Sequence, residues 1–96
     1  MSIQSFGDKK TEDIWNGQAS SRTVDFTPED ITAAQRKLDM LNAAHDLGDL
    51  RAGSNKLEAL KGTLAGSHSI KVNKQWEIIF RWTPDGPEEV RIVERQ

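Results

Sequence analysis

The clearest periodic segment of the chain is the stretch from 28 to 45. Its apolar residues recur every three or four positions, and its charged residues fall on the opposite side. The apolar set is Ile31, Ala34, Leu38 and Leu41, and the charged set is Arg36, Lys37 and Asp39. Thr27 suits the N-cap position and Pro28 the first helical turn. The pattern therefore predicts an amphipathic helix over about 28–45 that ends before Gly48.

Shorter elements are predicted on both sides of this helix. Residues 8–16 have the pattern of a short helix, and the apolar residues at 3–6 before it indicate a strand. Residues 46–54 contain two glycines and are expected to form a loop. A short apolar turn is expected around Leu57 and Leu60.

From Ser67 onward apolar and polar residues alternate, which is the pattern of β-strands with one buried face. A three-residue turn at 73–75 pairs Val72 with Trp76, whereas a two-residue turn would place Glu77 on the buried face. The sequence Pro84-Asp85-Gly86-Pro87 predicts a loop before the last strand. The turn at 73–75 also pairs Ile70 with Ile78, and the same logic continued across the second loop pairs Phe80 with Ile92 and Trp82 with Val90.

Together these elements predict an α+β fold. Two N-terminal helices would pack on one face of a small, mainly antiparallel sheet and leave the other face partly open. The 96 residues, 35% of them hydrophobic, are enough for one domain spanning 1–96.

The open face of the predicted sheet carries charged residues in rows. The register places Glu77 between Lys71 and Arg95 on the neighbouring strands, and Arg81 opposite Arg91. Two interpretations follow for the first row. It is either a structural row of exposed ion pairs, or a carboxylate that accepts a proton from a ribose 2′-hydroxyl while the two cations bind the scissile phosphate. For the Arg81–Arg91 pair, the alternatives are side chains splayed into solvent or an anionic partner held between them.

Charge is distributed unevenly along the chain. Residues 1–50 carry five Lys/Arg and nine Asp/Glu, whereas residues 51–81 carry six and two. The net charge of −2 therefore conceals a basic middle segment, which is either an anion-binding surface or an ordinary solvated one.

Composition narrows the possible chemistry. With no cysteine and two histidines outside any metal-binding spacing, we expect no metal site and no cofactor. No apolar run approaches the roughly 20 residues that a membrane span requires, and no signal peptide opens the chain. We therefore expect a cytoplasmic protein that acts without a membrane.

Several motifs resemble a known family. They are Asp49-Leu50-Arg51, Asn55-Lys56-Leu57-Glu58, Leu60-Lys61-Gly62, Ser69-Ile70-Lys71-Val72-Asn73, Gln75-Trp76 and Phe80-Arg81-Trp82. These stretches resemble the HigB-type toxins of the RelE/ParE superfamily. The resemblance implies a RelE-like α+β toxin that cuts mRNA on the ribosome without a metal. It also implies a HigA-type helix-turn-helix antitoxin, which would bind the toxin in a hetero-oligomer.

The resemblance and the predicted charged face together assign the site residues. The candidate catalytic residues are Lys61, Lys71, Glu77 and Arg95, and the candidate RNA-binding residues are Lys56, Asn73, Gln75, Arg81 and Arg91. Lys71 and Glu77 stand where the family commonly has arginine, and Glu94-Arg95-Gln96 replaces a frequent Asp-Tyr-His ending.

Because these departures fall on the candidate catalytic residues, two alternatives to a ribosome-dependent endoribonuclease remain open. The first is a degenerate, non-catalytic module that keeps only antitoxin binding. The second is a ParE-like toxin directed at DNA gyrase.

Overall fold

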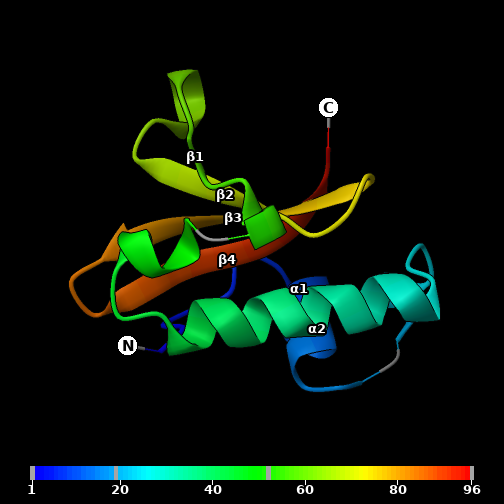
Figure 1. Ribbon diagram of the computed structural model, residues 1–96. Helices are drawn as coiled ribbons and strands as arrows, with labels where there is room; N and C mark the ends of the chain where they lie inside the picture. Colours follow the sequence, from blue (N-terminus) through cyan, green and yellow to red (C-terminus); the bar gives the residue numbers. More distant parts are fainter. Residues whose placement is uncertain (1, 19, 52, 96) are drawn as a thin grey trace.

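Two α-helices pack on one face of a four-stranded antiparallel sheet (Figure 1). The computed structural model describes residues 2–18, 20–51 and 53–95. The α-helices are α1 (Lys9–Trp15) and α2 (Pro28–Ala43), and the strands are β1 (Glu58–Ala59), β2 (Ser67–Lys71), β3 (Trp76–Thr83) and β4 (Gly86–Glu94). Single 3₁₀ turns occur at η1 (Ser21–Thr23), η2 (Leu47–Leu50), η3 (Gly53–Asn55) and η4 (Gly62–Leu64). The strand order is β1-β2-β3-β4, so each strand pairs with its sequence neighbour. The predicted α+β fold is confirmed.

Helix α2 begins as its sequence predicts. The hydroxyl of Thr27 accepts a hydrogen bond from the Asp30 backbone N–H at 3.0 Å, and the Asp30 carboxylate accepts one from the Thr27 N–H at 3.0 Å. This reciprocal capping box satisfies two of the N–H groups that a helix start leaves unpaired. Pro28 occupies the first turn, where its missing N–H has no cost. The helix ends at Ala43, two residues before the predicted end.

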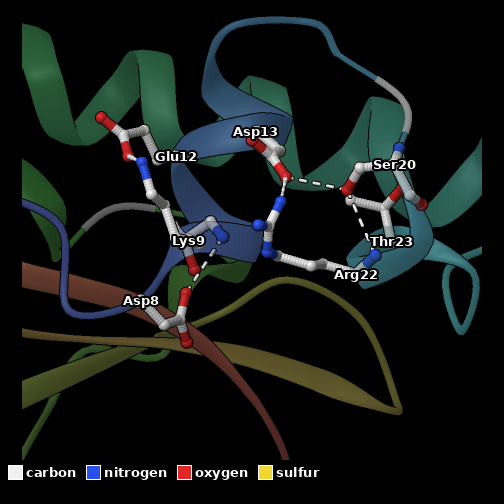
Figure 2. Close-up of polar contacts among 8 residues, drawn as sticks. Asp8, Lys9, Glu12, Asp13, Ser20, Arg22 and Thr23 are labelled. Carbon is white, nitrogen blue, oxygen red and sulfur yellow. Dashed lines mark hydrogen bonds and ion pairs between the residues drawn. The ribbon is translucent and has the colours of Figure 1, made fainter.

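Helix α1 is also confirmed, and a polar cluster joins it to η1 (Figure 2). The carboxylate of Asp8 caps the helix by accepting the Thr11 N–H at 3.0 Å. Farther along, the carboxylate of Asp13 accepts hydrogen bonds from the Ser20 hydroxyl at 2.8 Å and from Arg22 at 3.2 Å. The hydrogen bond from Ser20 is the main reason that the pKa of Asp13 lies below its ordinary value.

The turn between β2 and β3 has the predicted three residues. The side-chain oxygen of Asn73 accepts hydrogen bonds from the backbone N–H groups of Gln75 and Trp76, both at 2.9 Å. The backbone N–H of Val72 donates to the carbonyl of Trp76 at 3.0 Å. Ile70 consequently lies opposite Ile78, as predicted, and both side chains are fully buried in the core.

The predicted register between β3 and β4 is wrong. Ile92 lies opposite Ile78 rather than Phe80, and Pro87 rather than Val90 lies opposite Trp82. The predicted pairs of Glu77 with Arg95 and of Arg81 with Arg91 are likewise displaced, because their partners are Val93 and Glu88.

The cause is the turn length. Thr83 pairs directly with Gly86, so only Pro84 and Asp85 form the turn, instead of the predicted four-residue loop. Next to the turn, Pro87 opposite Trp82 lies three residues before the predicted partner Val90, and an irregularity at Glu89, which has a φ of 54°, moves the pairing back by one position. The total displacement beyond the bulge is two residues, and an even displacement keeps each side chain on its predicted face.

The outer edge of β4 is closed by the N-terminal segment. Residues 3–6 form one isolated parallel bridge between Phe6 and Val90 instead of the predicted strand. The backbone N–H groups of Gln4 and Gly7 donate to carbonyls of β4 at 2.7 and 2.8 Å. The buried hydroxyl of Thr11 accepts the Ile92 N–H at 2.9 Å. These contacts satisfy backbone groups that an edge strand would otherwise leave free.

The core lies between the helices and one face of the sheet. It combines helical side chains such as Leu38 and Leu41 with the inward-facing residues of β2, β3 and β4. Lys37 differs from its predicted place on the solvated side of α2, because only 9% of it is exposed. The chain between α2 and β2 also differs from the prediction. Residues 46–54 were expected to form a loop but include η2 and part of η3, and the stretch near Leu57, expected to be an apolar turn, contains the short strand β1. Within the described residues, no helix is long and apolar enough to cross a membrane.

Candidate functional site

A charged pocket lies on the sheet face opposite the core. It has a volume of about 240 Å³. Its lining consists of three cations, two carboxylates and one hydroxyl: Lys56, Lys71, Arg95, Glu58, Glu77 and Ser69. The pocket extends over all four strands, because Glu58 comes from β1, Ser69 and Lys71 from β2, Glu77 from β3, and Arg95 directly follows β4.

Strand pairing places these side chains together. Glu58 lies opposite Ser69, and Lys71 lies opposite Glu77. Val93 is the partner of Glu77 on β4, so Arg95 is the diagonal neighbour two positions further on the same face. Side chains in such diagonal positions remain within reach when they are long. The main expectation for this face, that Lys71, Glu77 and Arg95 gather on it, is therefore confirmed despite the error in register.

The hairpin between β2 and β3 orients Arg95. The backbone N–H of Arg95 donates to the carbonyl of Gln75 at 2.8 Å, and its guanidinium Nη1 lies 3.5 Å from the carbonyl oxygen of Asn73. The hairpin is itself anchored to α2, since the carboxylate of Asp30 accepts hydrogen bonds from the Asn73 amide at 2.8 Å and the Trp76 indole at 3.2 Å. The C-terminal cation is thus held by a connected series of contacts from the helix layer.

The charges around the pocket do not neutralise one another in pairs. Four ion pairs occur among the residues described by the structure, and none of them includes a pocket residue. Even Lys71 and Glu77, which are direct cross-strand neighbours, have no N–O distance within 4.0 Å. This geometry does not support the interpretation of the row as structural ion pairs.

The remaining predicted site residues lie outside this pocket. Lys61 is exposed at the start of η4, and its side chain does not line the cavity. Arg81 lies 3.7 Å from the Glu89 carboxylate, and both side chains are about half exposed. Arg91 lies opposite Ile79 and beside Gly7, instead of opposite Arg81.

The two polar residues of the hairpin have different surroundings. Both ends of the Asn73 amide are occupied inside the protein, by Asp30 and by the turn backbone. Gln75 is exposed at the tip of the hairpin. Of the two, Gln75 is the side chain that is accessible to a ligand.

Two pocket residues were missed from the sequence, Glu58 and Ser69. Lys56 and Glu58 alternate with apolar Leu57, which is the pattern of a strand with one polar face. Treating this stretch as an apolar turn concealed the alternation. Ser69 alternates in the same way with Ile70 and has no chemistry by itself that would distinguish it from other strand serines.

The arrangement can bind an anion and move a proton at the same place. Lysine and arginine side chains contribute charge and hydrogen-bond donors that suit phosphate oxygens. A neighbouring carboxylate can act as a general base toward a hydroxyl of the same ligand. Cations and carboxylates that share one cavity without forming pairs therefore suit a phosphodiester with an adjacent hydroxyl.

Comparison with known proteins agrees with the fold. The structure matches a YoeB–YefM complex from Staphylococcus aureus with a TM-score of 0.60 and 11% identity, covering 100% of this chain and 98% of that one. The molecule thus has the fold of the RelE-like toxins.

Sequence comparison defines the family more closely. A family model described as the RelE-like toxin HigB of type II toxin–antitoxin systems matches residues 4–94. The chain is 40% identical over 78 residues to Toxin HigB-1 of Vibrio cholerae serotype O1, which covers 80% of each protein. It is also 44% identical over 48 residues to an uncharacterized protein of Haemophilus influenzae, covering 49% of this chain and 48% of that one. The chain belongs to the HigB-like toxins of type II toxin–antitoxin systems.

Proposed function

We propose that this toxin is a ribosome-dependent endoribonuclease that cuts mRNA at the charged pocket. The observation that carries the proposal is the cavity of about 240 Å³ in which three cations and two carboxylates converge without pairing. A protein with a net charge of −2 is a poor general binder of free RNA. Dependence on mRNA that a ribosome already positions is consistent with that weak electrostatic attraction. The site of action would be the cytoplasm.

In the proposed reaction, Glu77 is the general base. Its carboxylate removes the proton from a ribose 2′-hydroxyl, and the 2′-oxygen attacks the adjacent phosphorus. The bond from phosphorus to the 5′-oxygen breaks, which leaves a 2′,3′-cyclic phosphate on one fragment and a 5′-hydroxyl on the other. A lysine ammonium of the pocket protonates the leaving 5′-oxygen. Lys71 on β2 and Arg95 just after β4 bind the phosphate oxygens and stabilise the added charge of the transition state.

The first test is expression of the toxin alone. Induction is expected to arrest growth and to produce cuts within translated codons, mapped from the 5′ ends of the fragments. Glu77→Gln is expected to lower the cleavage rate on programmed ribosomes by about 10²- to 10⁴-fold, the usual contribution of a general base. Glu58→Gln is expected to have a smaller effect, because Glu77 lies directly beside Lys71.

A matched control is Glu12→Gln. Glu12 lies on α1, and its ion pair with Lys9 is exposed, so its loss should leave cleavage unchanged. Normal growth during confirmed expression of folded toxin would refute the nuclease proposal. Growth arrest with intact mRNA would instead favour action on gyrase.

We also propose that a helix-turn-helix antitoxin of the HigA type binds this toxin. The support is membership of a toxin–antitoxin family and the similarity of the fold to a chain of a YoeB–YefM complex. Coexpression with a short neighbouring reading frame is expected to restore growth and to give a complex that copurifies. A stable complex formed by a toxin that never cleaves mRNA would identify the degenerate binding module.

A further inference from the structure

Lys37 is an unusual lysine because it is buried in the helix layer without a carboxylate partner. Only 9% of the residue is exposed, and none of the ion pairs among the described residues includes it. Its ammonium donates to the side-chain oxygen of Asn55 at 2.6 Å and to the Ser54 hydroxyl at 3.3 Å. Burial lowers the pKa of Lys37, since the charged form is poorly solvated there. Placing a charge in such surroundings is unfavourable unless hydrogen bonds compensate for the lost water.

The acceptor of this hydrogen bond is itself fully buried. Asn55 ends η3, and its amide N–H₂ group donates to the Leu50 carbonyl at 3.2 Å. Both ends of the Asn55 side chain are therefore occupied, one by α2 and the other by η2. The segment η3 also contacts β2, so it is held between the helix layer and the sheet.

The residue that follows, Lys56, has an unfavourable backbone conformation. Its φ is 49°, in the left-handed region that residues other than glycine seldom adopt. Such a conformation persists only when surrounding contacts impose it. Lys56 and, two residues later, Glu58 line the charged pocket. The buried hydrogen bond of Lys37 thus immediately precedes the turn that delivers two of the pocket residues.

We infer that Lys37 is a positioning residue for the pocket. Its hydrogen bond to Asn55 holds the left-handed turn at Lys56 and so places Lys56 and Glu58 beside Lys71 and Glu77. Lys37 acts through Asn55 and does not contact RNA. The inference rests on the proposed nuclease function for its catalytic consequence, but the positioning itself can be measured without any cleavage.

The first experiment is a double-mutant cycle between Lys37 and Lys56. Lys37→Met keeps the length of the side chain and removes its hydrogen-bond donor. We expect it to lower the cleavage rate at saturating ribosome concentration at least tenfold, to the level of Lys56→Ala. Apart from the smaller contribution of Glu58, the double variant should be no slower than Lys56→Ala alone, because the contribution of Lys56 is already lost. Arg36→Met removes an exposed cation from the adjacent position of the same helix. It should change the cleavage rate neither of the wild type nor of Lys56→Ala.

The second experiment reports position directly. Backbone NMR chemical shifts of Lys56 and Glu58 are expected to move toward unstructured values in Lys37→Met and to stay unchanged in Arg36→Met. This measurement remains informative if the wild-type toxin proves inactive, so failure of the proposed function can be distinguished from failure of the positioning inference. Unchanged shifts at Lys56 and Glu58, or independent and multiplicative rate effects of the two substitutions, would overturn the inference.

The absence of native cysteine allows a chemical rescue. Lys37→Cys can be alkylated with 2-bromoethylamine in urea and refolded, which restores an ammonium at nearly the original reach. Alkylation with 1-iodopropane gives a neutral side chain of the same length that has no hydrogen-bond donor, and this product is the matched control. The aminoethyl product should recover the wild-type shifts and cleavage rate, and the neutral product should not. If only ammonium-bearing chains fold at all, Lys37 supports the whole fold, and the specific positioning role is wrong.

Discussion

We expect the carboxylate of Asp30 to make one of the largest polar contributions to the free energy of unfolding. It accepts three hydrogen bonds: from the Thr27 backbone at 3.0 Å, the Asn73 amide at 2.8 Å and the Trp76 indole at 3.2 Å. It therefore joins the start of α2 to the hairpin between β2 and β3. Each such hydrogen bond contributes about 1 kcal/mol net to the free energy of unfolding. Because Asp30 is partly exposed, water can replace part of the bonding that a substitution removes.

From these contacts, Asp30→Ala is expected to lower the free energy of unfolding by about 2–3 kcal/mol. That corresponds to a fall in Tm of roughly 8–15 °C for a domain of this size. Asp30→Asn keeps one acceptor oxygen but presents an N–H₂ group to neighbouring donors, so about half of that loss is expected. Urea unfolding followed by tryptophan fluorescence is a suitable assay, since Trp76 is stacked on Phe26 with ring centroids 4.2 Å apart.

The effect of Asp30 should also depend on pH. The hydrogen bond from the Thr27 backbone is the main reason that the pKa of Asp30 lies below its ordinary value of 3.8 in the folded protein. The stabilisation is therefore complete above pH 3.8 and is lost as the pH falls through the lower folded-state pKa. The difference between wild type and Asp30→Asn should shrink over that range.

Asp39→Ala is the matched control, because Asp39 is exposed on the same helix. It should change stability by less than about 0.5 kcal/mol. A loss below about 0.5 kcal/mol in Asp30→Ala at neutral pH would show that the hairpin does not depend on this carboxylate, and the reasoning above would be wrong.

Two further predictions concern the N-terminal side of the sheet. Thr11→Val keeps the shape of the side chain but leaves the Ile92 N–H without its acceptor, so the free energy of unfolding should fall by about 1–3 kcal/mol in chemical denaturation. An unchanged free energy of unfolding would mean that water or another group replaces the hydroxyl. In Gly86→Ala the residue keeps a φ of 129° and its new Cβ would collide with the Ser2 carbonyl, whereas in Gly17→Ala φ is 72° and the new Cβ has no neighbouring atom within 4 Å. We therefore expect Gly86→Ala to lower the free energy of unfolding more than Gly17→Ala does. Equal losses in the two alanine variants, measured by the same unfolding assay, would show that the contact with Ser2 is unimportant.

Local signals in the sequence were sufficient to predict the two helices and the hairpin between β2 and β3. The Thr27–Asp30 capping box and the cap at Asp8 place the helix starts within one residue of the predicted ones. The turn at 73–75 could be predicted because only one turn length kept Glu77 out of the core. In each case residues close in sequence determine the structure.

The register of β4 could not be predicted in the same way. The sequence at 84–87 consists of residues typical of turns and is compatible with a four-residue loop. In the structure Pro87 nevertheless pairs with Trp82, and the irregularity at Glu89 shifts the strand again. The gathering of Lys71, Glu77 and Arg95 on one sheet face was predicted in spite of this error, because the face that a side chain occupies depends on parity, which a shift of two leaves unchanged.

The burial of Lys37 and the pocket role of Glu58 depend on contacts between distant segments. Helical periodicity alone assigns Lys37 to the polar side, and only the approach of η3 from beyond the helix covers it. Such contacts become visible only when the elements are assembled.

The closed edge of β4 has a practical consequence for handling the toxin. Gln4 and Gly7 supply backbone partners to β4, so an affinity tag joined directly before them would compete with that pairing unless a flexible spacer separates the two. Proteolytic trimming of the same segment would uncover a row of free amides and carbonyls along a long strand. A preparation clipped there would be prone to precipitate through strand-to-strand pairing, although its charged pocket would be intact.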